Sequence, residues 1–369
     1  MVLKQRTERH VRDITQANLL DKLITNNPRR IVPILSNSFR INQIFCAEDK
    51  MADLILQGSN LDENMPTIDE QLTQLWALKV YYPMDETRNL SRVAHYHQVK
   101  SGNSELAKKD YIDFLKSYLL DMSYDEEDCR ELVDQLTPDM QTLRFSEIVR
   151  QLKYPRFPAD IEDPLSQLAR LPFPIYITTS YFDFLERALI KAGNKRPRTE
   201  IVHWNDLKPT RASEIRAEPA FEEPTDPNEP SVAEPVVYHL FGLEEDPRSL
   251  VMSEDDFLKF LITAVSDNSK LHPVVPLRLQ QALAQSYLLL LGYQLKDWDF
   301  RILFRFLLNY RPDTTDSTGI FIQVQPKSDS PNLLEYLSKY FGIERFDVSW
   351  KTPEQFIQSL WLAQKGESS

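Results

Sequence analysis

Polar or otherwise unusual residues stand where four apolar runs of the sequence end. Hydroxyl, carboxamide, carboxylate and imidazole groups occur there beside two glycines, a mixture that can hydrogen-bond a polar ligand. Neighbouring parallel strands end at one edge of a sheet, so we expect these groups to line a ligand-binding crevice. The groups are Ser36-Asn37-Ser38, Thr178-Thr179-Ser180 with Asp183, His239 with Phe241-Gly242, and Gly292-Tyr293 with Asp297.

Structural roles compete with chemistry at several of these positions. Ser180 and Asp183 are spaced for a capping box, and Asp297 is placed to cap the helix that follows it. His239 precedes Phe241 by two residues, which puts both on one face of a strand. His239 is therefore either a base one pleat deeper in the crevice or a hydrogen-bonded histidine packed under a helix.

No residue pattern indicates a metal site. His95 and His97 are two apart in a predicted helix, so they face different ways. The acidic runs 244–246 and 254–256 are typical of solvated surfaces. Two cysteines, Cys46 and Cys129, cannot form a four-thiolate zinc site or a disulfide framework, which indicates buried or free thiols in a reducing compartment.

Composition excludes several classes of protein. The chain has 8 glycines and no G-x-G pair, so the phosphate-binding loops of kinases, ATPases and ordinary dehydrogenases are missing. A net charge of −12 disfavours direct binding to nucleic acid, and the basic segment 194–198 is interpreted as a solvated turn. The polar start and the lack of an apolar run of about 20 residues predict a cytoplasmic protein with no membrane contact.

The elements that must position these residues alternate between strands and helices. The run Tyr287–Leu291, closed by Gly292 and followed by a helix with apolar residues at 300–308, is typical of a fully buried strand and its crossover helix. The other predicted strands are 30–35, 174–179, 199–204, 236–241, 319–324 and 346–350. Helices are predicted over 1–29, 41–46, 104–120, 125–136, 140–152, 180–192, 257–265 and 276–285, and from 352 onward.

This order predicts an α/β fold with a Rossmann-like, mainly parallel sheet and a large helical insertion. Residues 1–47 begin the Rossmann-like domain, 48–170 form the helical insertion, and 171–369 complete the domain. Within the last part, residues 211–235 are acidic and rich in proline, so we expect a mobile loop there.

Taken together, the segments resemble the sirtuin-like domain family, in particular its bacterial and cyanobacterial defence-associated branch. The similarity is carried by Leu168–Leu185, by Val237–Gly242 leading to Ser249–Phe257, and by Leu290–Arg301. Asn89–Tyr96 is similar to the helical insertion of that family, and the resemblance extends from about Ile31 to Leu360.

The resemblance implies a Rossmann-like cleft that binds NAD or ADP-ribose. Defence members of the family hydrolyse NAD at the nicotinamide–ribose bond, and better-known members deacylate lysine. Deacylases of this kind usually carry a four-cysteine zinc module, so the two cysteines argue against zinc and against deacylation. The resemblance also assigns these strand-end residues to cofactor binding: Ser36, Asn37, Ser38, Thr178, Thr179, Phe241, Gly242, Gly292, Tyr293 and Asp297.

This sequence departs from the family at the reactive positions. The first strand normally ends in Gly-Ala-Gly, and here Ser36-Asn37-Ser38 follows it. Ser180 stands at the catalytic asparagine position and Phe241 at the catalytic histidine position. Phenylalanine cannot supply the general-base help that is worth roughly 10²–10⁴-fold in rate.

Two hypotheses follow. In the first, the chain is a sirtuin-like NAD-cleft protein of prokaryotic antiviral defence, which either hydrolyses NAD through Ser180, His239 and Asp183 or binds NAD or ADP-ribose without turnover. In the second, the cleft has degenerated and the domain is a scaffold or interaction module. The sequence leaves open whether the chain forms a homo-oligomer or joins a partner protein of the defence system.

Overall fold

The computed structural model describes residues 11–12, 31–56, 66–205, 229–266, 274–294, 298–310, 320–323, 346–349 and 351–365. Eight strands within these ranges form one sheet, in the order β1-β8-β7-β6-β2-β3-β5-β4, and every neighbouring pair is parallel. The predicted α/β class and parallel sheet are confirmed. The strands are β1 (Val11–Arg12), β2 (Ile31–Leu35), β3 (Ile175–Thr178), β4 (Arg198–Ile201), β5 (Val236–His239), β6 (Tyr287–Leu291), β7 (Ile320–Gln323) and β8 (Phe346–Ser349).

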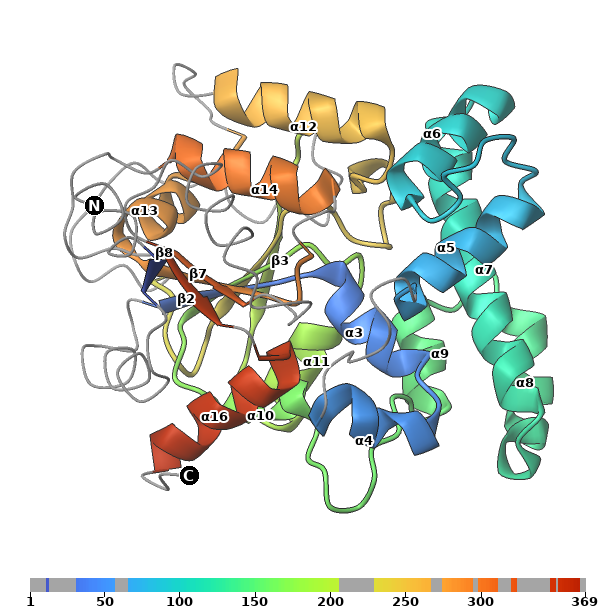
Figure 1. The fold of residues 1–369 in the computed structure, drawn as a ribbon, viewed down its shortest axis with the longest axis horizontal. Coiled ribbons are helices and arrows are strands. Elements are labelled where there is room, and N and C mark those ends of the chain that lie inside the picture. Colours follow the sequence, from blue (N-terminus) through green and yellow to red (C-terminus); the bar gives the residue numbers. More distant parts are fainter. Residues whose placement is uncertain are drawn as a thin grey trace, which may run out of the picture.

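The centre of the sheet is the pair β2 and β6, which is in register from Ile31↔Tyr287 to Leu35↔Leu291. Leu288 to Leu291 are completely buried, as an apolar run in a parallel sheet covered on both faces must be. Helices α12 (Glu254–Ser266) and α14 (Trp298–Asn309) pack together on one face of the sheet. On the other face, α10 (Pro164–Arg170) packs against both α11 (Phe184–Lys191) and α16 (Pro353–Lys365), as Figure 1 shows.

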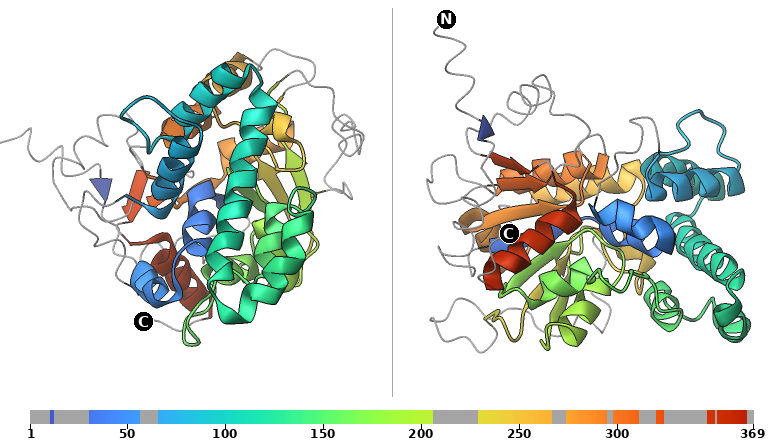
Figure 2. Two further views of the ribbon diagram at one scale, coloured as in Figure 1. Left: turned by 90° about the vertical axis from the view of Figure 1, so that its right-hand side faces the viewer. Right: turned by 60° about the horizontal axis from the view of Figure 1, so that its bottom comes forward.

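A layer of helices follows β2 and precedes β3. It lies beyond the carboxyl ends of the strands, on the right in Figure 1 and toward the viewer in the left panel of Figure 2. Its longest member, α7, joins it to the sheet through contacts with the loop after β5. The helices from β2 to α10 are α3 (Asn37–Ile44), α4 (Glu48–Leu56), α5 (Ile68–Lys79), α6 (Leu90–Ser101), α7 (Ser104–Tyr124), α8 (Arg130–Leu136) and α9 (Phe145–Gln151).

The remaining elements are short or peripheral. They are the 3₁₀ turns η2 (Glu127–Cys129), η3 (Thr137–Asp139) and η4 (Pro247–Ser249), and helix α13 (Leu277–Gln285) before β6. Helix α16, predicted from 352 onward, begins with a capping box, because Thr352 Oγ1 accepts from the Gln355 N–H at 3.1 Å and Gln355 Oε1 accepts from the Thr352 N–H at 3.4 Å.

Three predicted boundaries need correction. The helix predicted over 1–29 lies mostly outside the described residues, and within it Val11 and Arg12 form a strand that pairs with β8 at the sheet edge. Helix α3 begins four residues before the predicted 41, because Ser36 Oγ caps it by accepting from the Phe39 N–H at 3.1 Å. Strand β5 ends at His239, not at Phe241, because the chain turns at 240–241. Of the predicted loop 211–235, only 229–235 are described.

Candidate functional site

The order of the strands changes direction at β2. From β2 the chain passes to β3 and β5 on one side, and it then crosses over to β6 on the other side of β2. In parallel α/β sheets, ligands bind outside the carboxyl ends of strands at such a switch point. Ser36 to Ser38 and Gly292 to Tyr293 follow β2 and β6, the two strands that meet here.

Ser36 and Gly292 fasten the ends of β2 and β6 together. The Ser36 hydroxyl donates to the Gly292 carbonyl at 2.6 Å, and the Ser38 hydroxyl donates to the same carbonyl at 3.2 Å. Gly292 has φ +78°, and a Cβ placed on it would lie 2.6 Å from Ser36 Oγ and 2.9 Å from the Phe39 Cβ. Glycine is therefore required at 292, and the Ser36 side chain already fills the space beside it.

Thr179 connects the third strand end to the same edge. Its N–H donates to the Leu35 carbonyl at 2.9 Å, and its hydroxyl lies 3.1 Å from the Tyr293 hydroxyl. The Thr178 hydroxyl also donates to Leu35, at 3.3 Å, and the Tyr181 N–H donates to Asn37 Oδ1 at 3.4 Å. The structure thus brings residues 36–38, 178–181 and 292–293 into one hydrogen-bonded rim. Asp297 lies outside the described residues.

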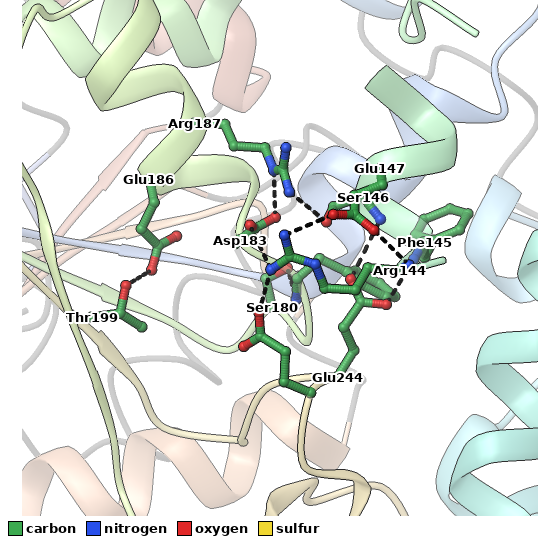
Figure 3. Close-up of polar contacts among 12 residues, drawn as sticks. Arg144, Phe145, Ser146, Glu147, Ser180, Asp183, Glu186, Arg187, Thr199 and Glu244 are labelled. Atoms are coloured by element: carbon green, nitrogen blue, oxygen red, sulfur yellow. Dashed lines mark hydrogen bonds and ion pairs between the residues drawn. The ribbon is translucent and has the colours of Figure 1, made fainter. Parts of the chain in front are cut away.

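His239 lies under this rim and is fully buried. Its Nδ1 is 3.0 Å from the Ser180 carbonyl and its Nε2 is 2.8 Å from Glu186 Oε1, so both ring nitrogens have partners. Burial acts to lower the pKa of His239, but the Glu186 carboxylate and the Ser180 carbonyl outweigh it, and the net shift is upward. Glu186 also accepts from the Thr199 hydroxyl at 2.9 Å (Figure 3). This geometry matches the alternative of a hydrogen-bonded histidine under a helix.

Phe241 does not share the environment of His239, contrary to the expectation from strand periodicity. Its ring packs edge-on against Phe257 and Phe260 of α12, with centroids 5.2 and 5.4 Å away, whereas His239 contacts α11 on the opposite face. The chain turns after His239, and Gly242 follows with φ +84°. A Cβ at Gly242 would lie 2.3 Å from the Ser249 carbonyl oxygen, so this glycine is required by the turn.

Ser180 and Asp183 do not form the predicted capping box. Ser180 is nearly buried, and its hydroxyl accepts from the Phe182 N–H at 3.2 Å, two residues along the chain. Asp183 precedes α11 but makes no side-chain cap. Figure 3 shows it between two arginines: Arg187 Nε donates to Oδ1 at 2.7 Å, and Arg144 Nη1 is 3.5 Å from Oδ2.

The acidic run 244–246 is not simply solvated, because Glu244 supports a helix of the layer beyond the sheet. Glu244 accepts from the backbone N–H groups of Phe145 and Ser146 at 2.8 and 3.4 Å, at the start of α9. Burial raises its pKa to about 7. Its neighbour Glu245 pairs with Arg144, which also binds Glu147. This network joins α9 to the loop after β5 (Figure 3).

The second acidic run contains a buried ion pair. Lys108 Nζ of α7 lies 3.1 Å from Asp256 Oδ2 of α12, and both side chains are almost inaccessible. Asp256 also accepts from the N–H groups of Met252 and Ser253 at 3.2 and 3.0 Å. The prediction of a solvated run is therefore wrong for Asp256, because α7 covers the start of α12.

Sequence reasoning missed two carboxylates beside the rim. Asp299, in the first turn of α14, is partly exposed, and its Oδ1 accepts from the Phe300 N–H at 2.6 Å. Burial raises its pKa to about 6, and the charge of Asp69 acts in the same direction. Asp69 Oδ1 is buried without a hydrogen-bond partner, while the Asp69 N–H donates to Asn42 Oδ1 at 2.9 Å. A first-turn acid resembles a helix cap, so spacing alone gave no signal of this pair.

In the described part of the chain, no group of three or more histidine, cysteine or acidic side chains is arranged to hold a metal ion. Cys46 and Cys129 are both buried free thiols, as predicted. None of the described helices is long and apolar enough to cross a lipid bilayer.

Comparison with known proteins agrees with the switch-point geometry. The model of one protein family, described as a SIR2-like domain, matches residues 174–344, from the start of β3 to just before β8. No curated protein matches the chain. Residues 174–344 are therefore similar to a SIR2-like, that is sirtuin-like, domain, and the strands β3 to β7 within them belong to the parallel Rossmann-like sheet.

Proposed function

We propose that this sirtuin-like protein binds NAD or ADP-ribose at the carboxyl ends of β2, β3 and β6 and acts in prokaryotic antiviral defence. One observation carries the proposal: residues 36–38, 178–181 and 292–293, which are far apart in the sequence, converge on one rim at the switch point of the sheet. Strands β3 to β7 of this sheet lie in the segment that is similar to a SIR2-like domain. The role in defence rests on the resemblance of the sequence segments to the defence-associated branch of the family.

The residues at the rim suit part of such a ligand. The Asn37 and Ser38 side chains are partly exposed and stand at the start of α3, where anionic groups are favoured. Hydroxyls that line a crevice can hydrogen-bond ribose. A pyrophosphate pressed against the backbone of Gly292 does not fit, because Ser36 occupies that space. We therefore propose that the ligand lies above Ser36.

The geometry favours a protein that binds the nucleotide but does not hydrolyse it through Ser180, His239 and Asp183. His239 has no exposed surface, and both its nitrogens are engaged. Asp183 is held by Arg187 and Arg144, and Ser180 is nearly buried. A general base must reach the proton that it removes, and none of these groups is free to do so.

Hydrolysis through Asp299 is a second candidate, favoured by its raised pKa and its position near the rim. A carboxylate with a pKa of about 6 can accept a proton near neutral pH. In this reaction a water oxygen bonds to C1′ of the nicotinamide ribose and the C1′–N bond breaks. The bonding electrons go to the nicotinamide nitrogen, and Asp299 takes the proton from the water. The products are nicotinamide and ADP-ribose.

Titration calorimetry with NAD and with ADP-ribose tests binding, and chromatographic detection of nicotinamide tests turnover. We expect both nucleotides to bind and to raise the melting temperature. Asp299→Asn should keep ADP-ribose binding and abolish any nicotinamide release, whereas Asp255→Asn on the exposed side of α12 serves as the matched control. If millimolar NAD and ADP-ribose leave the melting temperature unchanged, the scaffold interpretation replaces this proposal.

A further inference from the structure

Residues of α5, α6 and α7, and of the turn after α5, line an open cavity of about 390 Å³. Its lining includes Trp76, Lys79 and Tyr81 from the end of α5, His97 and Lys100 from α6, and Asp110 from α7. Asp69, near the rim, is at the first turn of α5, and Lys79, in the cavity lining, is its last residue. Ten residues of helix place the two about 15 Å apart along the α5 axis. The cavity is therefore distinct from the strand-end crevice.

Tyr81 occupies a position where helices normally place glycine. After α5 ends, the Tyr82 N–H donates to the Ala77 carbonyl at 2.9 Å and the Tyr81 N–H donates to the Leu78 carbonyl at 3.2 Å, which is the Schellman pattern. Tyr81 has φ +58°, which is strained for a residue with a side chain. The equivalent position after α6 is Gly102, with φ +66°. The fold thus keeps a strained tyrosine whose ring is not buried, since Tyr81 is 78% exposed.

The charged groups around the cavity leave positive charge available. Asp110 Oδ2 is 2.7 Å from His97 Nε2, and Asp113 is paired with Lys116 at 3.2 Å. Lys100 Nζ donates to the Val80 carbonyl and lies 5.4 Å from the Tyr81 ring centroid. Lys79 Nζ lies over the Phe114 ring at 5.7 Å and is exposed, and no carboxylate is within salt-bridge distance of it among the described residues.

His97, another residue of the cavity lining, has one ring nitrogen without a hydrogen-bond partner. His97 Nδ1 is buried and makes no hydrogen bond. When Nε2 carries the proton that Asp110 accepts, Nδ1 is a lone-pair acceptor for an N–H group. Because this nitrogen has almost no exposed surface, the groups that the cavity wall offers to a ligand are the Tyr81 ring and the Lys79 ammonium.

We propose that this cavity binds a small aromatic anion, a mononucleotide with a purine base. The volume lies near the lower end of the roughly 300–1,000 Å³ of typical ligand sites, which suits a mononucleotide better than a dinucleotide. The Tyr81 ring stacks on the base, since every base has a π face, and Lys79 binds the phosphate as a point charge.

Titration calorimetry of the full chain with AMP, at low ionic strength, tests the proposal. Adenosine and inorganic phosphate serve as separate probes of the two halves of the ligand. We expect AMP to bind more tightly than either one. Tyr81→Gly should weaken AMP binding about tenfold, as loss of base stacking does. Lys79→Gln should weaken it about fivefold, because an exposed charge contact is partly screened. Lys109→Gln, with the same charge change at an exposed site on α7, should not alter it.

Glycine relieves the strain at position 81, so Tyr81→Gly tests the ring without endangering the fold. A melting temperature equal to or above that of the wild type confirms that the variant is folded. AMP that fails to bind the wild type, or that binds Tyr81→Gly and Lys79→Gln as tightly as the wild type, would overturn the proposal. The latter result would place AMP elsewhere, for example at the strand-end crevice.

Discussion

Replacing Ser36 with glycine tests whether a side chain blocks the nucleotide crevice. The hydroxyl of Ser36 caps α3 through the Phe39 N–H and donates to the Gly292 carbonyl at 2.6 Å. Glycine is nearly as good an N-cap as serine, so losing the cap costs only a few tenths of a kcal/mol. The lost hydrogen bond costs about 1 kcal/mol, since Ser38 still donates to Gly292 at 3.2 Å. The added freedom of the unfolded chain brings the expected destabilisation of Ser36→Gly to about 2 kcal/mol.

Ser36→Gly also empties the space beside Gly292. In the wild type, Ser36 Oγ lies 2.6 Å from the point where a Cβ on residue 292 would stand. A pyrophosphate can then approach the backbone at this point. We expect ADP-ribose to bind Ser36→Gly about tenfold more tightly than the wild type, which is the contribution of one additional charge-assisted hydrogen bond. Stability is measured by urea unfolding and affinity by titration calorimetry.

Ser253→Gly is the matched control, because Ser253 is a buried N-cap residue of α12 and accepts from the Asp256 N–H at 3.2 Å. Ser253→Gly should lose about 1 kcal/mol, less than Ser36→Gly because the Ser253 hydroxyl makes the cap bond alone, without any change in ADP-ribose affinity. If Ser36→Gly is destabilised but binds ADP-ribose no better than the wild type, the crevice between β2 and β6 is not where the pyrophosphate lies. Unchanged stability would refute the hydrogen-bond argument itself.

Three other perturbations test separate parts of the structure. Phe241→His should lower the free energy of unfolding by about 2–4 kcal/mol in urea and yield no NAD hydrolysis, because the imidazole would be buried between Phe257 and Phe260 without a hydrogen-bond partner. Nicotinamide release by this variant would contradict the position assigned to the Phe241 ring. Lys108→Met should lower the free energy of unfolding by about 3 kcal/mol, because it leaves the Asp256 carboxylate buried without its ion-pair partner. The double variant, Lys108→Met with Asp256→Asn, should lose less stability than the sum of the two single variants. Additive losses would argue against the ion pair. Glu244 binds a proton in the folded state up to a pH of about 7 but in the unfolded state only up to about 4.5, so its contribution to stability falls as pH rises between these values. Glu244→Gln should flatten that part of the curve of unfolding free energy against pH, and a curve that keeps the wild-type slope would show that Glu244 is not buried as described.

The parallel sheet could be predicted because its central strands are short apolar runs closed by turn residues. Tyr287–Leu291 before Gly292 has the same bounds in the structure as in the sequence pattern. The strand predicted to reach Phe241 was too long, because Leu240 and Phe241 continue the apolar pattern of β5. Phe241 is buried against α12 and not within a strand, and local periodicity does not distinguish these two kinds of burial.

The convergence of the strand ends followed from topology, but the state of each side chain there did not. Ser36 caps a helix and fills a gap at once, and only the distance to Gly292 reveals the second role. Glu244 and Asp256 looked solvated because their burial comes from α9 and α7, which lie far away from them in the sequence. Asp69 and Asp299 lie on different helices, so no local spacing relates them.

Hydrogen exchange measured by mass spectrometry, with and without ADP-ribose, tests the central claim most directly, since it reports where a ligand contacts the chain. We predict that ADP-ribose slows exchange in peptides that contain residues 36–39 and 291–294, at the ends of β2 and β6. Protection confined to other segments, or no protection at saturating ADP-ribose, would contradict the claim that these strand ends form the nucleotide site.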